Sequence, residues 1–184
     1  MTARFTLAIL TLGSLATHAA VLCPDPSCTG GQPGYMSLPA DGESIYDFSS
    51  MESTRGWIVV NDGVMGGKSK GGFDLAPGRL VFAGATNTDG GGFSSIRGPL
   101  PDSTNRSSAD GLLLRVRATG DRVFQVALRQ REPERRYRLS YRAEIPLAAS
   151  DDWQEVRVPF EAFSGSWRGR EIGDARLDPA AATD

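Results

Sequence analysis

The chain has 184 residues, a formal net charge of −2 and 40% hydrophobic residues. This length fits one domain with a sizeable core, and the slightly acidic balance argues against nucleic-acid binding. The only histidine is His18. Any chain that starts beyond it therefore lacks Ser-His-Asp triads and histidine metal sites.

Residues 1–19 are predicted to form a signal peptide. Arg4 gives a positive start, an apolar stretch follows, and Thr17 and Ala19 are small residues at the spacing of a cleavage site. The apolar stretch is too short for a stable membrane span. A mitochondrial presequence is the alternative, but it would carry several arginines. We therefore expect an exported protein, periplasmic or secreted, with a mitochondrial location as the alternative.

Residues 20–43 are rich in Pro, Gly, Asp and Ser, which is typical of an extended leader. They contain both cysteines, Cys23 and Cys28. In an oxidising compartment these two are expected to form a local disulfide. A redox pair would have the spacing C-x-x-C, and a metal site would need more ligands.

Residues 44–184 show short apolar runs separated by turn residues. In several runs the side chains alternate, as at Leu112, Leu114 and Val116, and no segment has a convincing helical period. The pattern predicts an all-β sandwich of about eight strands. The runs are SIYDF (44–48), GWIVV (56–60), GRLVFAG (78–84), GGFSSIRG (91–98), GLLLRVRATG (111–120), RVFQVALRQ (122–130), RRYRLSYRAEIPL (135–147) and WQEVRVPF (153–160).

Five arginines stand opposite the apolar phase of these runs. They are expected to line one polar sheet face, either as a solvated face with arginine–glutamate pairs, which we favour, or as a surface for acidic groups or sugars. The five are Arg115, Arg117, Arg129, Arg138 and Arg142.

Two glycine-rich stretches, residues 57–73 and 87–98, contain more glycines than one hairpin turn needs. Close approach of the backbone to another chain or to a ligand is the other common reason for such glycines. We expect the two loops to meet at one end of the sandwich. Among the aromatic residues, Trp57 and Trp153 are expected in the core, and Trp167 lies in a loop where it can make contacts.

Carboxylate chemistry is weakly indicated. Asp62 and Asp89 are the best candidates for a glycosidase pair, although capping of their own turns is the favoured interpretation. Calcium ligands are offered by Asn61, Asp62, Thr88 and Asp89, without the twelve-residue pattern of a calcium loop. We therefore predict no metal, no cofactor and no enzymatic activity.

Several motifs resemble the complex I intermediate-associated protein 30 family across residues 45 to about 179. They are W-x-x-V-N-D-G-V-M-G-G-x-S (57–69), G-G-F-S-S-I-R (91–97), Asp47-Phe48, W-Q-E-V-R-V-P-F (153–160), F-x-x-x-W-R-G-R (163–170) and Leu177-Asp178-Pro179. The resemblance implies a galactose-binding-like jelly roll, and its mitochondrial members act as assembly factors of the respiratory NADH:ubiquinone oxidoreductase. It also implies further strands after Leu177-Asp178-Pro179, so C-terminal strands are expected to be missing here.

The sequence thus predicts a noncatalytic module that binds a protein partner through its glycine-rich loops. An exported carbohydrate-binding module is the alternative, using Arg97, Trp167 and the arginine face, and a carboxylate-based hydrolase is a remote third. The expected binding residues are Asn61, Asp62, Gly63, Met65, Gly66, Gly67, Ser69, Gly91, Gly92, Phe93, Ser95, Arg97 and Trp167.

Overall fold

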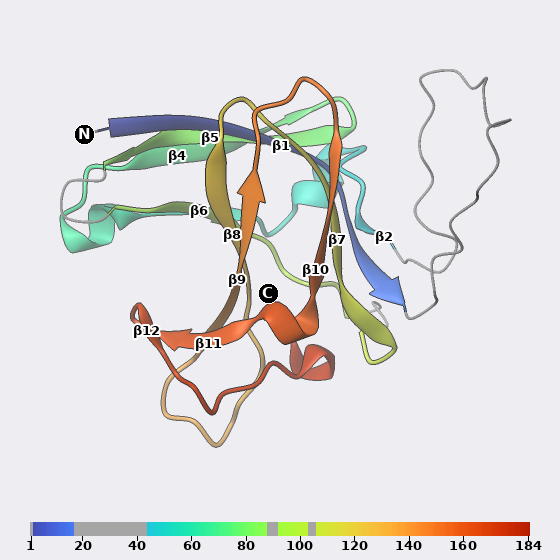
Figure 1. Cartoon of the computed structure of the whole chain (residues 1–184), viewed down its shortest axis with the longest axis vertical. Coiled ribbons are helices and arrows are strands. Elements are labelled where there is room, and N and C mark those ends of the chain that lie inside the picture. Colours follow the sequence, from blue (N-terminus) through green and yellow to red (C-terminus); the bar gives the residue numbers. More distant parts are fainter. Residues whose placement is uncertain (1, 17–43, 88–91, 103–105) are drawn as a thin grey trace, which may run out of the picture.

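The computed structural model describes residues 2–16, 44–87, 92–102 and 106–184 (Figure 1). About half of it is β-strand, and the described residues hold no helix longer than a short 3₁₀ turn, which confirms the all-β class. The 3₁₀ turns are η1 (Met51–Thr54), η2 (Asp62–Met65), η3 (Phe160–Ala162) and η4 (Pro179–Ala181). Cys23 and Cys28 lie outside the described residues, so their disulfide stays a prediction.

The described residues form twelve strands rather than about eight. They are β1 (Thr2–Ala16), β2 (Ser44–Tyr46), β3 (Ile58–Asn61), β4 (Lys70–Ala76), β5 (Arg79–Asn87), β6 (Ser94–Arg97), β7 (Ala109–Ala118), β8 (Arg122–Leu128), β9 (Ser140–Leu147), β10 (Gln154–Pro159), β11 (Ser164–Trp167) and β12 (Arg170–Glu171). The eight apolar runs correspond to β2, β3 and β5–β10. The extra strands have less regular patterns: β4 begins among glycines, and β11 and β12 are short.

Three sheets organise these strands. The largest has the order β10-β7-β1-β5-β4, with β2 also paired to β1; the second has the order β12-β11-β9-β8; and β3 pairs with β6 alone. Residues predicted to be a signal peptide therefore contribute β1 to the largest sheet (Figure 1). The strand pairs named by register are antiparallel.

The main core lies between the two larger sheets. Its buried side chains come mainly from β7 and β9, with single residues from β8 and β10 and three from outside the strands, and they include Leu114, Val116, Tyr141 and Ile145. The alternation seen in the sequence explains this, because β9 buries every second residue from Tyr141 to Leu147. β7 differs in burying Leu113 as well as its two neighbours, as expected for an internal strand that is covered on both faces.

A second, aromatic core lies beside β4 and β5. Tyr46, Phe48, Leu80 and Phe82 are buried there, and Trp57 packs against them. The Trp57 ring meets Tyr46 and Phe48 edge to face, at centroid distances of 5.2 Å and 5.6 Å, a preferred geometry of aromatic pairs. The expectation that Trp57 is a core residue is therefore confirmed.

Two further expectations about side chains were wrong. Trp153 is half-buried and belongs to neither core cluster; instead the Arg117 guanidinium lies 5.3 Å from its ring centroid. The five arginines do not share one face, because Arg115 and Arg117 are on β7 of the largest sheet whereas Arg142 is on β9 of the second. Alternation along single strands cannot tell which strands share a sheet.

Candidate functional site

The two glycine-rich loops meet around Asp62, which is only 3% exposed. Its carboxylate accepts hydrogen bonds from the Ser69 backbone N–H at 2.9 Å and from the Ser69 hydroxyl at 2.6 Å. The Asp62 backbone N–H donates to the Phe93 carbonyl at 3.2 Å, which ties the first loop to the second. The Ser69 hydroxyl also accepts from the Asn87 N–H at 3.0 Å, at the end of β5.

Two glycines in these loops allow this close packing. A Cβ atom at Gly67 would lie 2.1 Å from the Asp62 Cγ, and one at Gly92 would lie 2.1 Å from the Asn87 carbonyl oxygen and 2.7 Å from Asp62 Oδ2. No side chain fits in such a space, so both positions require glycine. We call Asp62, Gly67, Ser69, Asn87 and Gly92 the Asp62 cluster. The close approach expected of these glycines is thus made within the chain itself.

The electrostatics of the cluster favour a charged Asp62. The hydrogen bond from the Ser69 side chain is the main cause that lowers the pKa of Asp62 below its usual value, and backbone N–H groups act in the same direction against the effect of burial. A carboxylate held by its own loop in this way is a structural anchor. Its lack of exposure leaves it no surface to offer to a substrate.

Other expected site residues surround the cluster. Gly66 ends η2 in the left-handed conformation (φ 79°), and Gly63 has open space where a side chain would begin. The Asn61 side chain donates to the Gly71 carbonyl at 3.1 Å, and the Ser95 hydroxyl to the Val60 carbonyl at 3.1 Å. Met65 lies in η2. Gly91, Thr88 and Asp89 lie outside the described residues.

Apolar side chains are exposed on the strand pair beside the cluster. Ile58 and Val59 of β3 are 55% and 40% exposed, and Phe93, just before β6, is also exposed. Side chains alternate between the two faces of a strand, so exposure of two consecutive residues leaves both faces of β3 open in this region. We call Ile58, Val59 and Phe93 the β3 apolar surface.

Arg97 and Trp167 lie apart from the Asp62 cluster. Burial is the main cause that lowers the pKa of Arg97, and the charges of Arg129 and Arg142 add to it while Asp184 opposes it. Arg97 therefore belongs with the arginines near the C-terminal segment. The Trp167 ring lies 4.7 Å from that of Tyr137, and the Arg168 guanidinium is 4.9 Å from its centroid, so neighbours already cover part of this ring.

A second polar cluster was not foreseen from the sequence. The Tyr141 hydroxyl donates to Glu132 Oε1 at 2.9 Å and accepts from the Gln130 amide at 3.0 Å. Arg135 Nε forms an ion pair with the same Glu132 oxygen at 2.8 Å. Gln130 also accepts from the Asp178 N–H at 2.6 Å, which fastens the C-terminal segment. We call Gln130, Glu132, Arg135 and Tyr141 the Tyr141 cluster.

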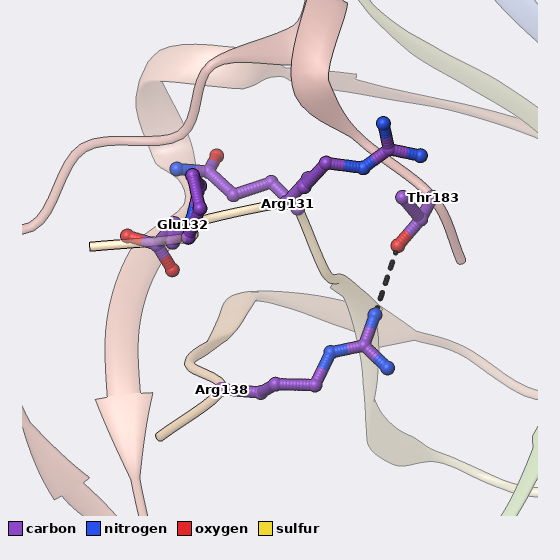
Figure 2. Close-up of a pocket in the computed structure, with 6 residues that line it drawn as sticks. Arg131, Glu132, Arg138 and Thr183 are labelled. Carbon is purple, nitrogen blue, oxygen red and sulfur yellow. Dashed lines mark hydrogen bonds between the residues drawn. The ribbon is translucent and has the colours of Figure 1, made fainter. Parts of the chain in front are cut away.

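An open cavity of about 330 Å³ adjoins this second cluster, lined by Gln130, Arg131, Glu132, Pro133, Arg138 and Thr183. Figure 2 shows Arg138 donating to the Thr183 hydroxyl, at 3.2 Å, with Arg131 extending toward Thr183 from the other side. Arg138 also pairs with the Asp184 carboxylate at 3.4 Å. The C-terminal residues Thr183 and Asp184 therefore already bind the Arg138 guanidinium and partly neutralise its charge.

Within the described ranges there is no group of three or more His, Cys, Asp or Glu side chains that would hold a metal ion. The same part of the chain contains no helix long and apolar enough to cross a membrane. The candidate site therefore consists of closely packed glycine-rich loops beside an exposed apolar strand.

Comparison with known proteins gives one clear relationship. The family model described as Complex I intermediate-associated protein 30 (CIA30) matches residues 46–183, which span most of the chain and contain both clusters. No curated protein and no solved structure gives a match. The resemblance seen in the motifs is confirmed, and the chain belongs to the CIA30 family of assembly factors.

Proposed function

We propose that this chain is a noncatalytic assembly-factor module that binds a protein partner through the β3 apolar surface and the glycine-rich loops beside it. The family match supports the assembly-factor class. The partner we infer is a protein of an assembly intermediate of complex I, because the family is described by its association with such intermediates.

The observation that carries this proposal is the exposure of Ile58 and Val59 together on β3. β3 has a single strand partner, β6, among the described residues. An apolar strand with an unpaired edge is a liability for a protein that acts alone, and it is a ready site for a partner strand or an apolar partner surface. Phe93 extends this surface toward the Asp62 cluster.

The Asp62 cluster has a supporting role in this proposal. Asp62 and Ser69 are buried and therefore act by holding residues 62–69 and 92–93 in place. A surface fixed before binding loses less conformational entropy when the partner arrives. Rigid loops beside an apolar strand are therefore expected to strengthen binding without touching the partner through charged groups.

The proposed partner also bears on the compartment. Members of the family are associated with mitochondrial complex I, which matches the mitochondrial alternative; the exported reading gains no support from the match. We propose that the chain acts where complex I intermediates are built. Fractionation of host cells that carry a C-terminally tagged chain tests this, and recovery solely from the medium overturns it.

The binding proposal is tested by co-migration. The tagged chain, expressed in its own host, is expected to co-migrate with a complex I intermediate on native gels. Ile58→Asp and Val59→Asp place a charge on the β3 apolar surface and are expected to weaken co-migration at least tenfold, since a buried unpaired charge is costly. The matched control is Val123→Asp on β8, at a valine that is 54% exposed.

Circular dichroism of the purified variants checks that all three remain folded. Equal co-migration of the β3 variants and the wild-type chain overturns the proposed surface. Co-migration lost equally in Val123→Asp would show that the effect is not specific to β3. Absence of any complex I subunit from the wild-type complex overturns the proposed partner.

A further inference from the structure

β1 joins two parts of the largest sheet. Its residues 2–9 pair with β5, its residues 7–16 pair with β7, and Leu12 and Gly13 pair with β2. Figure 1 shows this strand, in blue, running along β5 and then beside β7. Residues 7–9 are flanked on both sides, so the sheet is continuous only when β1 is in place.

β5 and β7 are not paired with each other anywhere in the described chain. Both are antiparallel to β1 and therefore run parallel to each other. Neighbouring strands lie roughly 4.8 Å apart. Where both strands flank β1, at residues 80–82 of β5 and 116–118 of β7, the gap between them is therefore roughly 9.6 Å and accepts one extended chain. We call the position of β1, bordered by residues 80–87 of β5 along residues 2–9 and by Ala109–Ala118 of β7 along residues 7–16, the strand slot.

The strand slot borders the core. Three side chains beside it are each at most 2% exposed: Leu80 of β5, and Leu113 and Val116 of β7. An empty slot would leave backbone N–H and C=O groups unpaired along two strands and would open the core beside them to water. The folded protein therefore needs a strand in this position.

The residues that hold the strand slot are also the residues whose pattern predicts a leader cleaved after Ala19. A segment that has been removed cannot remain a strand of the sheet. We propose that the strand slot is an acceptor: residues 2–16 hold it while they are attached, and an apolar strand of a partner protein takes their place after they are removed.

The geometry specifies the strand that fits. It runs antiparallel to β5 and β7, and it is free of proline where both sides are paired, because proline donates no ladder hydrogen bond. It is apolar in the doubly flanked stretch, as Leu7, Ala8 and Ile9 are, because internal strands covered on both faces carry continuous apolar sequence. This acceptor does not depend on the β3 apolar surface, so either proposal can fail alone.

Strand exchange in the full chain tests the acceptor. A protease site is inserted between residues 30 and 31, the folded chain is cut there, and an excess of labelled peptide with the sequence of residues 2–16 is added. We expect the label to enter the protein. Amide hydrogen exchange of β5 and β7 should be at least tenfold slower with the peptide bound than in cut chain from which residues 1–30 have been removed.

Two peptide variants separate strand pairing from general apolar binding. Ala8→Pro removes an N–H in the stretch flanked by both strands and is expected to bind at least tenfold more weakly. Thr2→Pro lies at the end of the strand, where only β5 is paired, and is expected to bind almost as well as the unchanged peptide. Equal binding of both variants overturns the acceptor, as does failure of the unchanged peptide to enter.

The partner strand is tested in the host with a photoreactive residue in place of Ala83, which is paired with Thr6 of β1. After irradiation we expect to recover a chain that lacks residues 1–19 and that is cross-linked, through position 83, to an apolar segment of another protein. A chain that retains these residues and is cross-linked only to itself overturns the exchange. Full protection of β5 and β7 in cut chain from which residues 1–30 have been removed also overturns it, because the slot would then close without a donor.

Discussion

The Asp62 cluster and the Tyr141 cluster each hold a nearly buried acid, but they do so by different means. Asp62 is held within one loop by Ser69, and glycines make room for it. Glu132 is held by the side chains of Tyr141 and Arg135. The first cluster therefore depends on backbone space and the second on side-chain partners that converge from separate segments.

The difference extends to the preferred charge states. The Asp62 cluster favours an ionised carboxylate, because its surroundings donate hydrogen bonds and lower the pKa of Asp62. The Tyr141 cluster favours a neutral phenol, because burial and the Glu132 carboxylate raise the pKa of Tyr141 to about 12. The two clusters should therefore fail at opposite ends of the pH scale, and by different substitutions.

The largest expected effect is steric and lies in the Asp62 cluster. Gly92→Ala would place a Cβ atom 2.1 Å from the Asn87 carbonyl oxygen and 2.5 Å from the Ser69 hydroxyl. Because a backbone atom cannot move aside cheaply, we expect the free energy of unfolding to fall by about 3 kcal/mol. Urea denaturation followed by tryptophan fluorescence measures this.

Gly63→Ala is the matched control for this prediction. It lies in the first glycine-rich loop, next to Asp62 of the same cluster, and a Cβ atom there would meet nothing within 4 Å. We expect it to change the free energy of unfolding by at most about 0.5 kcal/mol. Similar losses in the two variants would show that glycine is needed for the conformation of the loop rather than for space beside Asp62.

The second-largest expected effect is a loss of folding stability at alkaline pH, and it involves the Tyr141 cluster. The pKa of Tyr141 is about 12 in the folded chain against 10.0 for an unperturbed tyrosine, first through burial and then through its hydrogen bond to Glu132. Folding therefore favours the protonated form, and this contribution is complete below pH 10 and is lost as the pH rises through 12. We expect a loss of roughly 2–3 kcal/mol over that window.

Urea denaturation at a series of pH values tests this second prediction. Tyr141→Phe should flatten the alkaline slope, although Tyr46, whose pKa is also raised by burial, leaves part of it. Tyr137→Phe is the matched control, since Tyr137 is 40% exposed. An alkaline slope that is unchanged in Tyr141→Phe would contradict the assignment.

These two clusters also show what the sequence can predict. The Asp62 cluster leaves a trace in the sequence because its geometry requires glycine at Gly67 and Gly92, and such positions form a motif. The Tyr141 cluster leaves none, since Gln130, Glu132 and Tyr141 are ordinary residues whose meeting depends on the pairing of β9 and on the C-terminal segment. Close packing of backbone is visible in a sequence, whereas converging side chains are not.

The same reasoning applies to the fold. Alternation predicted the all-β class and most strands, because each half-buried strand carries its own period of two. It missed β4, whose glycines were interpreted as a loop, and it placed Arg115 and Arg142 on one face although they belong to different sheets. β1 was interpreted as a leader, since an apolar run with small residues suits either a signal peptide or an internal strand.

The smallest expected effect comes from one hydroxyl in the Asp62 cluster. Ser69→Ala keeps the backbone N–H that binds Asp62 but removes the 2.6 Å hydrogen bond to its carboxylate and the acceptor for the Asn87 N–H. We expect the melting temperature at neutral pH to fall by about 4 °C, a smaller change than that of Gly92→Ala, because the loop keeps its shape.

The pH dependence of unfolding at acid pH distinguishes this last prediction from the others. The folded-state pKa of Asp62 is lowered, chiefly by the Ser69 hydroxyl, so its contribution to stability is present above the ordinary aspartate pKa and is lost as the pH falls through the lowered value. Ser69→Ala should therefore move the acid unfolding midpoint to higher pH and leave the loss of stability at alkaline pH unchanged. Tyr141→Phe should change the loss of stability at alkaline pH and leave the acid unfolding midpoint unchanged. If both variants changed stability at the same end of the pH scale, the two clusters would be one coupled unit and their contrasting charge preferences would not be separable.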